Sequence, residues 1–184
     1  MDIDYTSKGL IFDPDFNQWF YDGDIVSKKV ADELKLKFKK EEYLRKNVEV
    51  FAKLMEAIPV IIDPNISSIE QIKEYKMKYD KAKSGDRDYF KSEAEILGVS
   101  IDNVMDKVLS LGSKYEQINN ELTAKAGSVK VGVDKLIEAG KFGMADKAFE
   151  FVQGINRDNV FSVTIQSFLD AVTGGDTILK VIEQ

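Results

Sequence analysis

The sequence predicts a mainly α-helical fold: a helical bundle with one long heptad-patterned helix and a small N-terminal β-hairpin. Two observations lead to this prediction. Apolar residues recur at helical spacing over most of the chain after residue 27, and the first 24 residues hold short β-prone runs separated by turn residues. We assign 1–26 to the hairpin or arm and 27–184 to a helical domain, and leave open a further division near 86 or 126. An α+β fold is the alternative if 60–62 joins the hairpin.

The expected hairpin pairs 9–12 with 18–21. The segment between them, Asp-Pro-Asp-Phe-Asn, has the composition of a turn. An isolated hairpin is only marginally stable in water, so it must pack on the rest of the protein. Three consecutive aromatic residues provide the obvious packing surface or, alternatively, a partner-binding face: Trp19, Phe20 and Tyr21.

A helix should begin after Ser27, which is a good N-cap residue. The fully polar stretch 39–42 shifts the phase of its apolar stripe, so we expect a kink or break there. Pro59 should end this helix, and 60–62 should be extended. The Ser-Ser-Ile-Glu sequence at 67–70 fits a capping box for the next helix, which should stop near Gly85.

Further on, a short helix should span 89–97, with Gly98 as its C-cap. We then expect one helix over 101–125, a break or bend at the Ala-Gly-Ser sequence of 126–128, and a second helix over 128–139. Gly154 should end the helix after that. Asn159 should cap another, which the Gly-Gly pair at 174–175 ends.

A heptad seam in the 101–125 helix is the clearest periodic feature of the chain. Its apolar members follow at intervals of 4, 3, 4, 3 and 4: Val104, Val108, Leu111, Tyr115, Ile118 and Leu122. An apolar stripe of this kind must be covered. Either an intramolecular helix covers it, such as the stripe ending in Val48, Phe51 and Met55, or a second copy or a partner helix does.

Composition excludes several kinds of chemistry. The chain has no cysteine and no histidine, so thiolate nucleophiles, disulfides, zinc fingers and the usual general base are absent. Asp13, Asp15, Asn17 and Asp24 partly match a calcium loop, but Gln18 stands where that loop needs glycine. The pairs Glu93 with Glu95 and Asp102 with Asp106 have no predicted burial to separate their pKa values. We therefore expect no enzyme activity, no metal and no cofactor.

Charge and hydropathy restrict the partners. The net charge is −6, which argues against general nucleic-acid binding. The segment 28–46 is locally basic, but its interleaved acids predict a solvated face with i,i+4 pairs, attracted to the acidic hairpin. No apolar run is long enough to span a membrane, and the acidic N-terminus lacks the apolar region of a secretory signal.

Two stretches, 9–24 and 97–108, resemble parts of small accessory proteins of tailed bacteriophages, in particular tail and tail-fibre assembly factors. This resemblance implies a non-catalytic role in the virus particle or its assembly. We expect a binding, structural or assembly protein that contacts a protein partner or a second copy, in the host cytoplasm or the virion. The alternative is a small acidic inhibitor of a host defence or nucleic-acid-binding protein. An enzyme that uses carboxylates alone ranks third.

Overall fold

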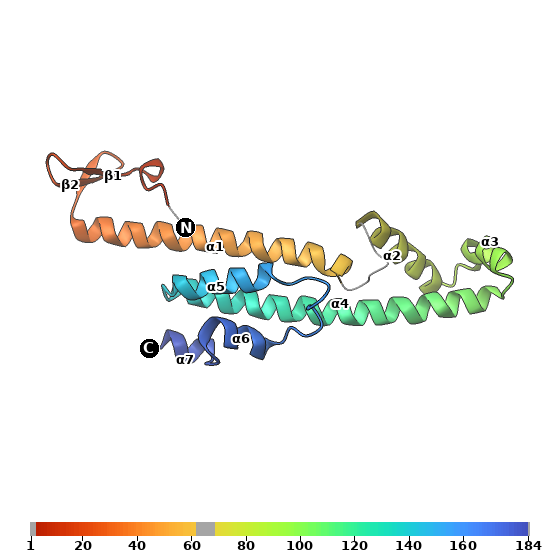
Figure 1. The fold of residues 1–184 in the computed structure, drawn as a ribbon. Helices are drawn as coiled ribbons and strands as arrows, with labels where there is room; N and C mark the ends of the chain where they lie inside the picture. The colour runs from red at the N-terminus through yellow and green to blue at the C-terminus, as the bar shows by residue number, and fades with distance from the viewer. Residues whose placement is uncertain (1–2, 62–68, 184) are drawn as a thin grey trace. The chain divides into compact units, whose positions relative to one another are not determined.

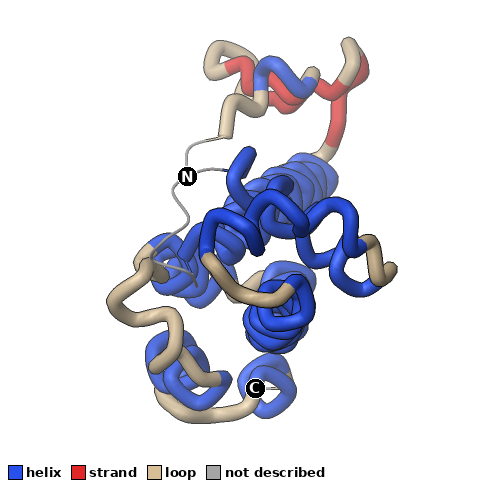
Figure 2. The backbone as a smooth tube through the Cα atoms, turned by 90° about the vertical axis from the view of Figure 1, so that its right-hand side faces the viewer, coloured by secondary structure: helices blue, strands red, loops and turns tan. Residues whose placement is uncertain are grey.

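The computed structural model describes residues 3–61 and 69–183 and has a mainly α-helical fold with a small antiparallel sheet at the N-terminus, which confirms the predicted fold class. Figure 2 shows the strands gathered in one place, with helices making up most of the rest. The helices after the sheet, labelled in Figure 1, are α1 (Lys28–Ile61), α2 (Ile69–Lys83), α3 (Arg87–Leu97), α4 (Ile101–Glu138), α5 (Phe142–Gln153), α6 (Ile165–Thr173) and α7 (Ile178–Ile182).

The N-terminal sheet contains the predicted hairpin and one further strand. A short 3-10 helix, Thr6–Lys8, precedes β1 (Leu10–Asp13), which pairs antiparallel with β2 (Gln18–Tyr21). A second turn leads to β3 (Asp24–Val26), which pairs with the other side of β2. The strand order is therefore β1-β2-β3.

Helix α1 begins where the sequence predicts, because the Ser27 hydroxyl accepts a hydrogen bond from the Val30 N–H at 3.2 Å. The break expected near 39–42 is wrong, since these residues lie inside one continuous helix. Lysine and glutamate are good helix formers, and a polar turn interrupts the apolar stripe without opposing helical geometry.

The end of α1 also corrects a prediction. The helix continues past Pro59 to Ile61, so the described part of the predicted extended segment is helical. Proline has no N–H to bond to the carbonyl four residues before it, and the last carbonyls of any helix have no partner within the helix. Side chains from elsewhere bind two of these carbonyls: the Tyr115 hydroxyl donates to the Pro59 oxygen and Arg157 Nη2 donates to the Val60 oxygen, both at 3.1 Å.

Helix α4 is continuous from Ile101 to Glu138, so the predicted break at 126–128 is wrong. A glycine inside a helix costs about 1 kcal/mol relative to alanine, which is too little to interrupt a helix that has buried residues both before and after that position. Ala126 is buried, and the Ser128 hydroxyl donates to the Ala124 carbonyl at 3.1 Å, a bond that is compatible with the helix.

Replacing each of three α4 glycines by alanine should give three different results. At Gly127 nothing lies within 4 Å of the position that a Cβ atom would occupy, so Gly127→Ala should stabilise the protein by about 0.5–1 kcal/mol. At Gly132 the Cβ would meet the flexible end of Ile178 at 2.5 Å, which leaves the change near neutral. At Gly112 it would lie 2.2 Å from the Tyr79 ring, so Gly112→Ala should destabilise by about 1–3 kcal/mol. Urea unfolding of the three variants measures this order, and equal shifts would contradict it.

Two other predicted helix ends agree with the structure and a third does not. Gly98 caps α3 in a left-handed conformation, as predicted, and Gly154 follows the end of α5. Asn159, however, does not cap a helix. Helix α6 begins later, at a capping box in which Thr164 and Ser167 bind each other's backbone N–H groups. The capping box predicted at 67–70 lies mainly outside the described residues.

The chain divides into two compact units, each built from segments distant in sequence. Unit 1 comprises Met1–Phe51, Val129–Gly154 and Thr164–Gln184, and unit 2 comprises Ala52–Ser128 and Ile155–Val163. The division predicted at residue 26 stays a prediction.

In unit 1, the first part of α1 packs against the end of α4 and against α5. The Tyr43 hydroxyl donates to Asp146 Oδ2 at 2.8 Å, and the Tyr43 ring lies 4.8 Å from that of Phe142. One turn further along, Asn47 is fully buried, and its Nδ2 donates to the Lys130 carbonyl at 3.2 Å and to Asp134 Oδ1 at 2.8 Å. These polar contacts fix which residues of the helices face each other.

The Tyr43 hydroxyl should make unit 1 sensitive to alkaline pH. Burial, reinforced by the hydrogen bond to Asp146, raises the pKa of Tyr43 from 10.0 to about 12. The folded state therefore holds this proton more tightly than the unfolded state, and the stability it contributes is complete below pH 10 and lost as the pH rises towards 12. Between about pH 8 and pH 11.5 the loss should be about 2 kcal/mol.

Tyr43→Phe isolates this effect from the titration of lysines and other tyrosines. The variant should be about 1 kcal/mol less stable than the wild type at pH 8 because it lacks the hydrogen bond, and more stable than the wild type near pH 11.5. Guanidinium unfolding at both pH values measures the crossover. Parallel pH profiles of the two proteins would contradict the prediction.

In unit 2, helices α2, α3 and the beginning of α4 share a small apolar core. Its buried members are Ala82, Phe90, Ala94, Val104 and Met105. Phe90 is fully buried and comes from the middle of the shortest of these three helices. This core explains how α3, with eleven residues, is held in place, because isolated helices of that length are marginal.

Candidate protein-binding surfaces

The three aromatic residues of β2 do not form one surface, because neighbouring residues of a strand point to opposite faces. Trp19 and Tyr21 pack against the apolar cluster that joins the sheet to α1, whose buried members are Leu10, Ala31 and Phe38. Lys35 Nζ of α1 lies 3.7 Å from the centre of the Trp19 ring. Phe20 lies on the other face of β2, so only this member of the predicted trio is placed to meet a partner.

Trp19→Ala should loosen the sheet from α1. Trp19 is half-buried, so the free energy of unfolding should fall by about 2 kcal/mol, less than the roughly 3–5 kcal/mol typical of a fully buried aromatic. Leu10 is 1% exposed. Relative to the size of the side chain removed, Leu10→Ala should therefore lower the free energy of unfolding more than Trp19→Ala does. Chemical unfolding followed by circular dichroism measures both variants. An unchanged midpoint for Trp19→Ala would place the indole outside the packed interface.

The outer face of the sheet carries a cross-strand apolar row. Phe20 pairs with Ile11 on one side and with Ile25 on the other, so the three side chains lie next to each other across the three strands. Ile11 is 48% exposed and Ile25 is 65% exposed. We call Ile11, Phe20 and Ile25 the outer row. Neither isoleucine was among the predicted partner-binding residues, although the period-two alternation of 10–13 and 18–21 already places Ile11 and Phe20 on one face.

Acidic residues lie close to the outer row, at the ends of β1 and β3 and in the turns between the strands. Asp13 ends β1, and its Oδ1 accepts hydrogen bonds from the Asp15 and Phe16 N–H groups, at 2.9 and 3.3 Å. These bonds make the calcium-like sequence a local turn. Within residues 3–61 and 69–183, no group of acidic side chains is arranged to hold a metal ion. Asp13, Asp15, Asp22 and Asp24 also make no ion pair with any described residue.

The heptad seam of α4 is buried at one end only. Val104 belongs to the core of unit 2, and Val108 packs at its border. Helices α2 and α3 therefore cover this end. The α1 stripe was one of the coverings that the sequence left open, and its Val48 is 55% exposed.

The rest of the seam alternates between covered and exposed positions. Tyr115 is half-buried and hydrogen bonds to the carbonyl of Pro59, and Leu122 is half-buried. Leu111 is 59% exposed and Ile118 is 36% exposed, seven residues apart on the same side of the helix. These two side chains form a second, smaller apolar surface.

Most basic side chains of the α1 segment 28–46 interact with residues of unit 1. Its side chains form i,i+3 and i,i+4 pairs such as Lys29 with Glu33 at 4.0 Å and Arg45 with Glu49 at 2.6 Å. Lys46 pairs with Asp146 of α5 at 3.7 Å. The predicted attraction to the acidic hairpin is not seen as an ion pair: among the described residues none joins α1 to the aspartates of the sheet, and Lys35 lies over the Trp19 ring instead.

One carboxylate of each predicted pair is engaged in an ion pair. Glu93 accepts a hydrogen bond from Lys78 at 2.7 Å. Asp102 accepts from both terminal nitrogens of Arg87, and this hydrogen bonding lowers the pKa of Asp102. A carboxylate kept ionised at the surface is a poor general acid, because it has no proton to give near neutral pH.

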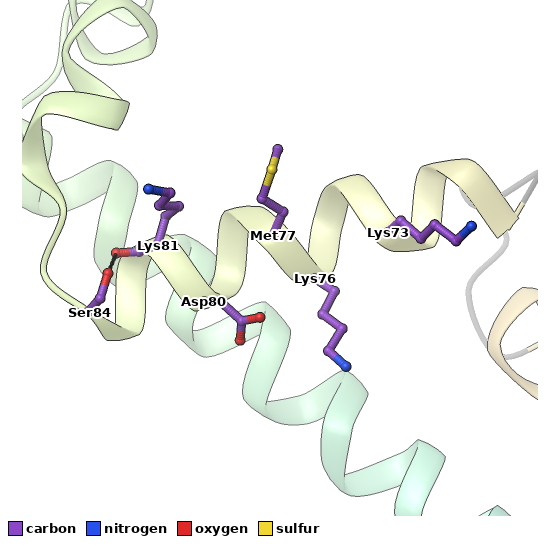
Figure 3. A pocket seen from close by; sticks show the side chains of 6 residues that line it. All are labelled: Lys73, Lys76, Met77, Asp80, Lys81 and Ser84. Atoms are coloured by element: carbon purple, nitrogen blue, oxygen red, sulfur yellow. Dashed lines mark hydrogen bonds between the residues drawn. The ribbon is translucent and has the colours of Figure 1, made fainter.

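A shallow hollow lies along one stripe of α2, with a volume of about 470 Å³. Its lining residues are Lys73, Lys76, Met77, Asp80, Lys81 and Ser84. In Figure 3, Met77 and Lys81 leave the helix on one side and Lys76 and Asp80 on the other. Met77 is 49% exposed. Lys81 pairs with Asp86 at 2.9 Å, whereas Lys73 and Lys76 make no ion pair with any residue in the described part of the chain.

Comparison with protein-family models, with curated protein sequences and with solved structures finds no match for this chain. In the described residues, no helix is long and apolar enough to cross a membrane. The surfaces described above are therefore the basis for inferring a function.

Proposed function

We propose that this protein works without catalysis, by binding other protein chains as a structural or assembly protein. The outer row carries this proposal. A sheet that is apolar on both faces is normally covered on both faces, and here α1 covers one of them. The other face leaves two isoleucines about half or more exposed next to Phe20, and apolar groups rimmed by charge are typical of protein interfaces.

The resemblance of 9–24 and 97–108 to accessory proteins of tailed bacteriophages supports an assembly role, in the host cytoplasm or in the virus particle. The first of these stretches contains all of β1 and β2 and therefore two of the three residues of the outer row. On this proposal, the outer row contacts another component during assembly.

A second candidate is a small acidic inhibitor that covers a basic, nucleic-acid-binding surface of a host protein. The unpaired aspartates around the outer row favour it, because a concentrated negative charge resembles the phosphates that such a surface binds. The two candidates differ in one measurable property. Nucleic acid should compete with the protein for an inhibited target, and should leave an assembly contact unchanged.

Affinity capture with matched variants tests the proposal. Ile25→Asp changes the outer row at its most exposed position, and Leu36→Asp makes the same kind of change at a 45% exposed residue of α1. Protein chains that bind through the outer row should be recovered by the wild type and by Leu36→Asp, and lost with Ile25→Asp. Recovery of the same chains by all three proteins would overturn the proposal. Leu111→Glu with Ile118→Glu reports separately on the seam.

A further inference from the structure

We infer that the outer row of one copy binds the α2 stripe of a second copy, so that the protein assembles head to tail. This inference rests on the proposed function and names the partner. The α2 stripe consists of the residues that line the hollow on α2, from Lys73 to Ser84.

The first step is that the outer row needs an apolar helix or strand of suitable width. Helices commonly cover sheet faces, as α1 does on the inner face of this sheet. The α2 stripe offers an exposed methionine, whose flexible thioether adapts to irregular surfaces, flanked by the aliphatic stems of three lysines.

The second step is charge. The aspartates around the outer row have no cationic partner among the described residues, and therefore favour a basic partner. On α1, Lys29 and Lys35 already contact acids or an aromatic ring of their own unit, whereas Lys28 makes no such contact with a described residue. On α2, Lys73 and Lys76 have no such partner within the described residues, and they flank Met77. Asp80 also lines the stripe, but three lysines stand against this one acid, so the two surfaces remain complementary in charge and in polarity.

The third step is symmetry. The outer row and the α2 stripe are different surfaces, in units 1 and 2 respectively, and every copy carries both. A contact between two different surfaces is heterologous, and repeats into a ring or an open chain rather than stopping at a dimer. One small sheet against one helix stripe buries less area than a standard interface of about 800 Å² per partner, so we expect weak association, with a Kd on the order of 10–100 μM.

Mixing two variants tests this arrangement. Ile25→Asp disrupts the outer row and leaves the α2 stripe intact. The double variant Lys73→Glu with Lys76→Glu disrupts the α2 stripe and leaves the outer row intact. In sedimentation velocity or light scattering at low salt, the wild type should form species larger than dimers as its concentration rises. Each variant alone should be a monomer, and their mixture should form a 1:1 complex that grows no further, because only one intact pair of surfaces remains.

A second charge-reversal variant serves as the control. Lys107→Glu with Lys114→Glu, which changes the same charge at exposed positions of α4, should associate like the wild type. Raising the salt from about 50 to about 500 mM should weaken association about tenfold or more, because the contact depends on charge. A wild type that stays monomeric at millimolar concentration would overturn the inference, and so would variants whose mixture forms no complex. Capture of other proteins through the outer row would then still support the proposed function.

Discussion

Asn47→Asp should lower the free energy of unfolding by about 3–5 kcal/mol at pH 7, since an uncompensated buried charge is among the most costly single changes. The Asn47 amide is fully buried and donates both to a backbone carbonyl of α4 and to the Asp134 carboxylate. A carboxylate at this position would meet two acceptors instead. The nearby Lys130, which already pairs with Asp134 at 3.0 Å, should offset only part of the repulsion.

The stability loss of Asn47→Asp should change with pH in a defined direction. The introduced carboxylate should have a raised pKa in the folded state, because burial and the neighbouring Asp134 both disfavour its charge. The folded state then binds more protons than the unfolded state, so the deficit relative to the wild type should shrink as the pH falls towards 4.

Two further variants complete the test. Asn120→Asp makes the same substitution at an exposed position of α4 and should cost less than about 0.5 kcal/mol. Combining Asn47→Asp with Asp134→Asn exchanges the donor and the acceptor and should recover more than half of the loss. Urea unfolding at pH 7 and pH 4 measures all of these proteins. Equal stability of Asn47→Asp and Asn120→Asp would show that the Asn47 amide has no role in joining α1 to α4.

Phe90→Ala should destabilise unit 2 by about 3–5 kcal/mol, the range for a fully buried aromatic residue. Phe90 lies in the apolar core that joins α2, α3 and the start of α4, and no larger side chain belongs to that buried cluster. Removing it leaves a cavity that short helices cannot fill without losing their contacts with α4.

Hydrogen exchange measures where the effect falls. Amides of α2 and α3 should lose protection by about 100-fold or more, the equivalent of roughly 3 kcal/mol, while amides of α5 in unit 1 should change far less. Tyr89→Ala removes the neighbouring aromatic residue, which is 42% exposed, and should leave α2 and α3 protected. A uniform loss of protection across α2, α3 and α5 would mean that the two units unfold together.

Local chemistry predicted much of the fold because it depends on neighbours in the chain. The turn at 13–17 and the strands beside it follow from Asp, Pro and Asn between β-prone runs. Ser27 caps α1 and Gly98 caps α3 because a hydroxyl acceptor and a left-handed glycine satisfy helix ends wherever they occur. The apolar residues Ala145, Ala148, Phe149 and Val152 of α5 recur at helical spacing and are all buried in the structure.

The predictions that failed concern helix continuity. Gly127 and Pro59 both act as helix breakers in sequence, at a cost of about 1 and 3 kcal/mol respectively. Both are inside helices in the structure. Tyr115, 56 residues beyond Pro59, binds a carbonyl that the end of α1 leaves without a partner in the helix, and no local pattern predicts such a distant donor.

For the candidate surfaces, too, the sequence predicts some features and the tertiary structure decides others. Composition and spacing alone establish that the chain has no histidine or cysteine chemistry, that its N-terminal segment is acidic and aromatic, and that 104–122 carries a heptad seam. Tertiary packing was needed to show that Trp19 faces α1 while Phe20 faces outwards with Ile11 and Ile25, and that Val104 is buried while Leu111 is exposed. Spacing places residues on a common face, but which face is covered depends on packing between segments far apart in the chain.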